Sequence, residues 1–166
     1  TRHIGSTEEG EQDMSVTYRV GTPGDEEALL AIEDEAFVYR NDKFGKREMK
    51  HLLTRAHAEV VVAEANEGIV GFAVLLFRKG SSVAHGWSMA VLPAYQHNGV
   101  TTGLFEWSEQ HLREEGYRRV SFEVRSANDG AQRLYERLGY HEIEQMPDHF
   151  GPGHDGLRMV KDLCCD

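Results

Sequence analysis

Residues 91–105, VLPAYQHNGVTTGLF, mark the point where a strand is expected to pass into a helix. The apolar run ends at Pro93, a polar loop follows, and Gly99 precedes the Val-Thr-Thr of the expected helix start. The first N–H groups of a helix have no partner within the helix, and the helix dipole is positive at that end. Because glycine lets the backbone approach an anion closely, the stretch predicts an anion site, with an ordinary strand-to-helix turn as the alternative.

The sequence on either side of this stretch follows the apolar periods of strands and helices. Expected strands are 15–22, 58–66, 68–80, 81–93, 117–126, 140–146 and 155–163, and expected helices are 21–37, 46–57, 99–116 and 128–139. Strand–helix–strand crossovers in the second half predict parallel pairing there, while the turn at 66–68 predicts an antiparallel hairpin. We therefore expect an α/β (α+β mixed) fold with a mixed sheet, in one domain over residues 15–166 that follows a disordered arm at 1–14.

Composition and charge limit the classes of function. The chain has 166 residues, of which 40% are hydrophobic and 28% charged, which is ordinary for a globular domain. Its formal net charge of −10 argues against nucleic acid or an anionic membrane as a partner and suits an amine-bearing substrate. No apolar run is long enough for a membrane span or an export signal, so we expect a cytoplasmic protein. Adjacent Cys164 and Cys165 predict reduced thiols, and we expect no metal.

The loop at 96–102 and the segment EVRSANDGAQRLYERLGY at 123–140 together resemble the GNAT N-acetyltransferases. Gln96, Gly99 and Thr101 occupy the marked positions of the pattern Q/R-x-x-G-x-G/A, which in that family cradles the pyrophosphate of acetyl-CoA. The second segment is similar to the family pattern E-V-R-x-x-N-x-x-A-x-x-L-Y-x-x-x-G-F/Y. Within the superfamily the chain most resembles the RimI-type protein N-terminal (alpha-amino) acetyltransferases. The resemblance implies a mostly antiparallel sheet of about seven strands, about four helices, and a splayed parallel strand pair that holds acetyl-CoA.

The resemblance also implies which residues bind acetyl-CoA. The implied set is Met89, Ala90, Val91, Gln96, His97, Asn98, Gly99, Val100, Thr101, Thr102 and Asn128. In it, the strand residues 89–91 act through backbone groups, as an added strand would. Asn128 caps a helix, contacts the cofactor, or does both. Thr101 stands where the family prefers Gly or Ala, so its hydroxyl either binds phosphate, which we favour, or marks weakened binding.

Two side chains match the family's proton-transfer positions. Glu123 matches the glutamate base, and strand alternation in RVSFEVR places it on the face opposite to Phe122. An ion pair with Arg118 or Arg125 is the purely structural alternative for this glutamate. Tyr135 matches the tyrosine that protonates the departing thiolate, although it also belongs to an apolar helical stripe and thus suits the core.

The acceptor is less constrained than the donor. We expect acetyl transfer to a primary amine, with a protein N-terminal alpha-amine as the best guess and a small amine or a lysine side chain as the alternative. His149 and Phe150 replace the tyrosine pair that holds the peptide in RimI-type enzymes, and the acidic run 33–35 is expected to be a solvated helix face. A GNAT module that binds acyl-CoA without catalysis is an alternative of another class. Either a monomer or a homodimer is compatible with the sequence.

Overall fold

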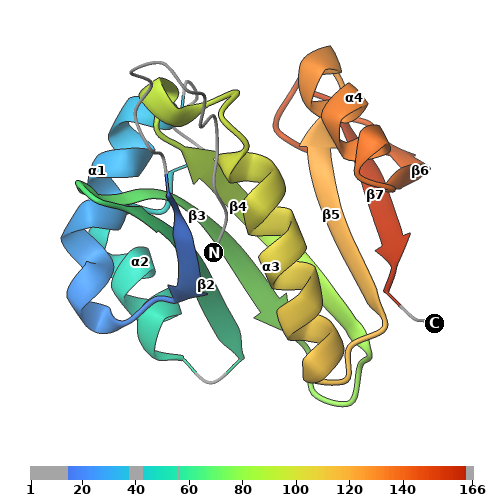
Figure 1. The fold of residues 1–166 in the computed structure, drawn as a ribbon. Helices are drawn as coiled ribbons and strands as arrows, with labels where there is room; N and C mark the ends of the chain where they lie inside the picture. The colour runs from blue at the N-terminus through green and yellow to red at the C-terminus, as the bar shows by residue number, and fades with distance from the viewer. Residues whose placement is uncertain (1–14, 38–42, 56, 164–166) are drawn as a thin grey trace, which may run out of the picture. The chain divides into compact units, whose positions relative to one another are not determined.

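A computed structural model describes residues 15–37, 43–55 and 57–163 (Figure 1). Along the chain the strands are β1 (Thr17–Val20), β2 (Ala58–Ala65), β3 (Gly68–Phe77), β4 (Val83–Val91), β5 (Arg119–Arg125), β6 (His141–Met146) and β7 (Gly156–Asp162). The α-helices are α1 (Glu26–Ala36), α2 (Gly45–Thr54), α3 (Val100–Glu114) and α4 (Asp129–Arg137), and short 3-10 helices are η1 (Pro23–Asp25) and η3 (Pro93–Tyr95). This order confirms the predicted succession of strands and helices. The predicted arm 1–14 and the two cysteines lie outside the described residues.

The strands form one seven-stranded sheet in the order β1-β2-β3-β4-β5-β7-β6. Pairing is antiparallel between β1 and β2, β2 and β3, β5 and β7, and β6 and β7, and it is parallel between β4 and β5. The crossover through α3 therefore gives the predicted parallel pair. The crossover through α4 does not, because β7 lies between β5 and β6 and takes both as antiparallel neighbours. The chain turns back from β6 into the antiparallel strand β7, and β7 occupies the place beside β5 where we expected a parallel neighbour.

The chain divides into two compact units. Of the described residues, the first unit comprises 15–37, 43–55, 57–76 and 88–108, and the second comprises 77–87 and 109–163. Strand β4 and helix α3 contribute residues to both units.

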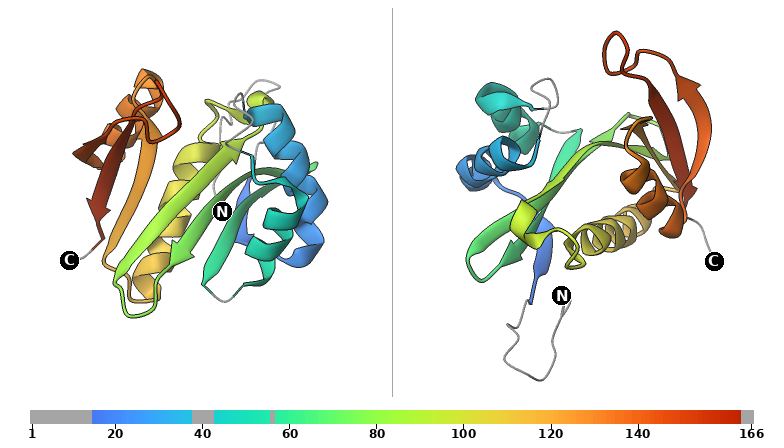
Figure 2. Two further views of the ribbon diagram at one scale, coloured as in Figure 1. Left: turned by 180° about the vertical axis from the view of Figure 1, so that it is seen from behind. Right: turned by 90° about the horizontal axis from the view of Figure 1, so that it is seen from above.

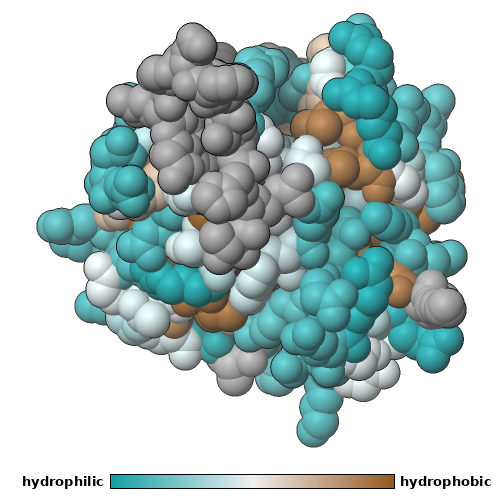
Figure 3. Space-filling model, in the orientation of Figure 1, coloured by the Kyte–Doolittle hydropathy of each residue, from teal (hydrophilic) through white to brown (hydrophobic). Residues whose placement is uncertain are grey.

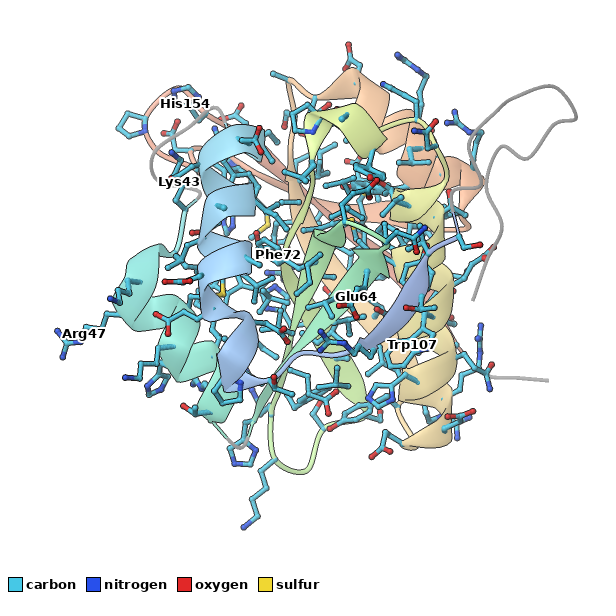
Figure 4. The ribbon with its side chains drawn as sticks, turned by 60° about the vertical axis from the view of Figure 1, so that its left-hand side comes forward. Lys43, Arg47, Glu64, Phe72, Trp107 and His154 are labelled. Carbon is cyan, nitrogen blue, oxygen red and sulfur yellow. The ribbon has the colours of Figure 1, made fainter. Side chains whose placement is uncertain are left out.

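The first unit has helices on both faces of its strands. Val60, Val61 and Val62 of β2 are all buried, which requires cover on both faces because successive strand side chains alternate. Figure 2 shows α1 and α2 on one side of β2 and β3, and the start of α3 on the other. Phe72 lies in the core beside α1 (Figure 4). The buried cluster on that side is Leu29, Ile32, Met49, Leu52, Ala58, Val60, Val62, Phe72, Val74 and Ala90.

Helix α3 approaches β1 closely at Gly103. A β-carbon at this position would overlap the hydroxyl oxygen of Tyr18. A side chain at Gly103 would therefore displace the Tyr18 ring, so the glycine permits the close approach of that ring to α3.

Glu33 corrects the prediction of a solvated acidic face on α1. Asp34 and Glu35 are exposed, as expected, but Glu33 is only 1% exposed. Its carboxylate accepts hydrogen bonds from the backbone N–H groups of Phe44 at 2.6 Å and Gly45 at 3.3 Å, at the start of α2. Burial raises the pKa of Glu33, and the two N–H donors partly oppose that rise. Glu33 therefore joins the two helices, a role that a search for amphipathic faces does not detect.

In the second unit, the two faces of β5 differ in burial. Val120, Phe122 and Val124 are buried, while the alternating positions are partly exposed, as the sequence predicted. The Phe122 ring packs against the rings of Tyr135 and Tyr140, with centroid distances of 4.9 Å to each. Both tyrosines belong to the segment of α4 and its C-terminal turn, so this segment covers the apolar face of β5.

The surface is mainly polar. Figure 3 shows mostly hydrophilic residues on the visible described face, with limited hydrophobic areas. Among the residues that the structure describes, no helix is long and apolar enough to cross a membrane.

Candidate active site

The loop between β4 and α3 takes the form that the sequence predicted. Gly99 has a φ of 86°, and the N–H of Gly103 donates to the Gly99 carbonyl at 2.9 Å, so the first α-helical hydrogen bond begins at this glycine. The N–H groups of residues 100–102 precede that bond and have no acceptor within the helix. A glycine in the left-handed region followed by these donors has the chemistry of a phosphate-binding turn.

Two side-chain hydrogen bonds hold this loop against the end of β4 and the β2–β3 turn. Gln96 donates from its side-chain amide to the Val91 carbonyl at 3.0 Å, and the Tyr95 hydroxyl donates to the carboxylate of Glu67 in the β2–β3 turn. His97 adopts a φ of 68°, a left-handed conformation that costs a non-glycine residue about 1–2 kcal/mol. Sequence reasoning missed this strained position, because histidine, although enriched at positive φ relative to most residues, adopts it too rarely to predict it.

The predicted cofactor-binding residues of the first unit differ in the exposure of their side chains. The side chain of Val100 is fully buried, so this residue can offer an anion only its backbone. Thr101 and Thr102 are half-buried, and His97 is exposed. The structure thus brings the predicted residues 96–102 into one turn, in which backbone groups outnumber side chains as candidate ligands.

The predicted strand residues Met89, Ala90 and Val91 form the end of β4. The parallel register between β4 and β5 pairs Val83–Gly86 with Arg119–Phe122, and β4 continues beyond it. Ala90 and Val91 have buried side chains, so any contact with a ligand would use their backbone, as the sequence predicted.

Asn128 acts as the N-cap of α4 in the second unit. Its side-chain oxygen accepts from the N–H of Ala131 at 3.1 Å, which confirms the predicted cap. The Asn128 side chain is otherwise exposed, so its suggested contact with a cofactor stays a prediction.

Glu123 lies on the polar face of β5 between two cationic or potentially cationic neighbours. Its Oε1 is 2.8 Å from Nε2 of His85 on β4, and its Oε2 accepts from Nε of Arg158 on β7 at 3.1 Å. The expected structural partners Arg118 and Arg125 are therefore not the ones in these two bonds. The register explains the contact, because Arg158 is the direct cross-strand neighbour of Glu123.

The environment of Glu123 favours its ionised form. Its side chain is only 12% exposed, and this burial alone would raise the pKa. The hydrogen bonds from His85 and Arg158, together with the charge of Arg158 and that of His85 when it is protonated, outweigh the burial, so that the pKa of Glu123 lies below its usual value. Since the carboxylate is an acceptor only, the His85 tautomer compatible with this contact carries its proton on Nε2 and leaves Nδ1 as an acceptor.

The polar row continues to the edge of the sheet. Nη1 of Arg158 donates to Glu144 of β6 at 3.1 Å, so His85, Glu123, Arg158 and Glu144 link four neighbouring strands. Sequence analysis missed His85 and Arg158. Neither belongs to a short motif, and only the pairing register of β4, β5 and β7 could have identified them.

Tyr135 packs its ring against Phe122, whose side chain points away from the Glu123 face of β5. Burial raises the pKa of the Tyr135 phenol above its usual value, so the group keeps its proton at neutral pH. A protonated, partly buried phenol is suited to donate a proton and unsuited to act as a base. Both sequence interpretations of Tyr135 are therefore compatible, because the ring packs in the apolar layer while the hydroxyl has the chemistry of an acid.

Within the described ranges, no three His, Cys, Asp or Glu side chains gather in a group that could hold a metal ion. The candidate groups described above are the N–H groups of the turn at 96–102, the paired carboxylate of Glu123 and the protonated phenol of Tyr135.

The sequence of the chain is similar to that of known acetyltransferases. Residues 26–140 match the acetyltransferase (GNAT) family, and the chain therefore belongs to this family. An N-alpha-acetyltransferase of Sulfurisphaera tokodaii is 29% identical over 122 residues, which are 67% of this chain and 73% of the relative.

Solved structures share the fold. The ribosomal-protein-S18-alanine N-acetyltransferase from Escherichia coli superposes with a TM-score of 0.81 at 22% identity, covering 92% of this chain and 96% of that one. The PaiA N-acetyltransferase of Thermoplasma acidophilum, solved in complex with coenzyme A, has a TM-score of 0.76 at 19% identity, covering 90% and 99%. The mixed sheet with four α-helices is thus the GNAT fold.

Proposed function

We propose that the protein transfers acetyl from acetyl-CoA to a primary amine, with a protein N-terminal alpha-amine as the leading acceptor. The observation that carries this proposal is the ionised Glu123 hydrogen-bonded to His85 at 2.8 Å, in a chain of the acetyltransferase (GNAT) family. The relative named N-alpha-acetyltransferase supports this choice of acceptor.

The turn at residues 96–102 fits the pyrophosphate of acetyl-CoA. Its φ of 86° at Gly99 turns the chain into α3 without a side chain on that residue. The N–H groups of Val100, Thr101 and Thr102 then meet negative charge at the positive end of the helix dipole. When bound, acetyl-CoA supplies an activated thioester, and the chain's own part is to hold its phosphates.

Proton removal is assigned to the His85–Glu123 pair. An amine must lose a proton to attack a thioester, and a carboxylate with a lowered pKa is by itself a weak proton acceptor. His85 is 38% exposed and Glu123 only 12%, so the imidazole is the more accessible of the two. In this mechanism Nδ1 of His85 takes the proton, directly or through water, while Glu123 holds the ring and stabilises its positive charge.

Proton donation is assigned to Tyr135. Its phenol is protonated at neutral pH because burial raises its pKa. A thiolate that leaves the acetyl group needs a proton, and a positioned phenol can supply it. The His85–Glu123 pair on one face of β5 would thus remove a proton, and the Tyr135 phenol over the other face would donate one.

The function is tested by a CoA-release assay with three acceptor sets: peptides with free N-termini, polyamines, and N-terminally blocked lysine peptides. We expect the highest kcat/KM on N-terminal peptides, and the product mass should place the acetyl group on the alpha-amine. Turnover confined to polyamines or lysine would move the assignment to the alternative acceptor. Calorimetric binding of CoA together with no turnover on any amine would instead show a binding module without catalysis.

A further inference from the structure

A second polar cluster is buried in the second unit, around Glu109 of α3. Glu109 is 5% exposed, yet both of its carboxylate oxygens are engaged. Oε1 accepts from Nζ of Lys161 on β7 at 2.8 Å, and Oε2 accepts from the hydroxyl of Tyr140 at 2.8 Å. Arg113, one turn along α3, lies 3.9 Å from Oε1.

Lys161 also reaches the end of α4. Its Nζ donates to the carbonyl of Leu138, the C-cap residue of that helix, at 2.8 Å. Gly139 follows with a φ of 102°, and a β-carbon there would lie 3.2 Å from Cε of Lys161. A cation at a helix C-terminus satisfies a terminal carbonyl and interacts favourably with the dipole. Lys161 thus fastens the last turn of α4 to both β7 and α3.

The same turn holds Tyr135. The N–H of Tyr140 donates to the Tyr135 carbonyl at 3.0 Å, so the two residues are joined through the backbone at the helix end. Their rings both pack on Phe122 with centroid distances of 4.9 Å. Any shift of the helix end that Lys161 and Glu109 hold is therefore passed to the tyrosine assigned to proton donation.

We propose that Glu109 and Lys161 are positioning residues for catalysis, which hold the C-terminal turn of α4 so that Tyr135 can protonate the leaving thiolate. This proposal rests on the proposed function. The Lys161 side chain is 24% exposed and that of Glu109 only 6%, and such a largely buried ion pair is a weak source of stability, because the loss of hydration of the two charges offsets their attraction. What the pair does supply is a fixed geometry, since the Lys161 ammonium must satisfy the Glu109 carboxylate and the Leu138 carbonyl together.

The test is a double-mutant cycle on kcat with Lys161→Met and Tyr135→Phe, measured at saturating acetyl-CoA. We expect Lys161→Met alone to lower kcat by about tenfold or more, with KM for acetyl-CoA within about twofold, as for a small displacement of a reacting group. In the Tyr135→Phe background the same substitution should change kcat by less than about twofold, because the group through which it acts is gone. Equal losses in both backgrounds would overturn the proposal, since a general structural defect is additive.

Two further variants keep the test decisive. Glu109→Gln combined with Lys161→Met removes both charges and leaves an acceptor for Tyr140, and it should reproduce the loss in kcat if Lys161→Met alone folds poorly. Asp162→Asn is the matched control, because it breaks the exposed pair with Arg119 at the next position of β7 and should keep wild-type kcat. A loss of kcat in this control as large as that in Lys161→Met would overturn the proposal.

Hydrogen exchange gives a readout that does not depend on activity. The amides of residues 138–140 should exchange faster in Lys161→Met than in Asp162→Asn, because their turn has lost a cap. Unchanged exchange there would refute the holding role. If the wild-type protein transfers no acetyl group, the proposed function fails, and this measurement still decides whether Lys161 holds the helix end.

Discussion

The two units carry candidate site groups of different kinds. In the first unit the turn at 96–102 offers mainly backbone N–H groups, organised by one glycine with positive φ and the start of a helix. In the second unit the candidate groups are side chains from separate strands and a helix, with protonation states set by their neighbours. Under the proposed function, the turn of the first unit would hold the cofactor's phosphates, and the side chains of the second unit would transfer protons. Substitutions should therefore divide between Kd and kcat according to the unit.

The largest effect is expected for Tyr135→Phe. Loss of a general acid typically costs about 100-fold or more in rate. The ring still packs on Phe122, so the Kd for CoA measured by calorimetry should stay near that of the wild-type protein. Steady-state CoA release gives kcat. Wild-type turnover in this variant would remove Tyr135 from the mechanism. A change only in the Kd for CoA would contradict the expectation that substitutions in the second unit act on kcat.

His85→Ala and Glu123→Gln should each lower kcat by about 100-fold, the lower limit of what general base catalysis typically contributes. Because the two residues act as one pair, the double variant should lose little more than either single one. His141→Ala, an exposed histidine at the start of β6, is the control and should keep its activity. Losses that multiply in the double variant would show that the residues act independently.

Gly99→Ala tests the first unit. A β-carbon at a φ of 86° costs about 1–2 kcal/mol, and the relaxed backbone would aim the N–H groups of the turn away from the phosphates. We expect the Kd for acetyl-CoA to rise by about tenfold at a nearly unchanged kcat under saturation. Thermal unfolding reports the cost to the fold separately. A collapse of kcat at unchanged Kd would reverse the assignment of the two units.

Thr101→Ala should have a smaller effect on the same turn. If the hydroxyl binds phosphate, its removal should weaken acetyl-CoA binding by about threefold to tenfold, the contribution of one ordinary hydrogen bond. Thr102→Ala is the matched comparison at the neighbouring position. Tighter binding by Thr101→Ala would show that the β-branched side chain crowds the cofactor, the other interpretation of this departure from the family pattern.

The smallest change in activity at neutral pH is expected for Arg158→Gln. Loss of this cation should raise the pKa of Glu123, which carbon NMR of its carboxyl group can follow. The carboxylate stays largely ionised near pH 7, so kcat there should change little. A lowered pKa means that Glu123 stabilises the fold above its unfolded-state pKa of about 4.3, and that this stability is lost as the pH falls through its folded pKa. Arg158→Gln should therefore reduce the fall in unfolding free energy on acidification. An unmoved pKa would show that His85 alone controls the carboxyl group.

The parts of the molecule that were predictable rest on local patterns. The strand that ends at Val91, the glycine at 99 and the cap at Asn128 are each specified by neighbours in the chain. Glu33 was assigned wrongly because its two N–H partners belong to the next helix. His85 was overlooked for a similar reason, since its contact with Glu123 spans 38 positions of sequence.

By itself the sequence determined the order of strands and helices, the glycine turn at the start of α3 and the faces on which Glu123 and Tyr135 lie, because period, caps and motifs act over a few residues. Tertiary structure alone decided which charges surround Glu123, that Glu33 and Glu109 are buried, and that Lys161 reaches the end of α4. The physical reason is range. Hydrogen bonding within a turn is set by neighbours in sequence, whereas burial and the pKa of a side chain depend on strand register and on helices that the chain brings in from far away.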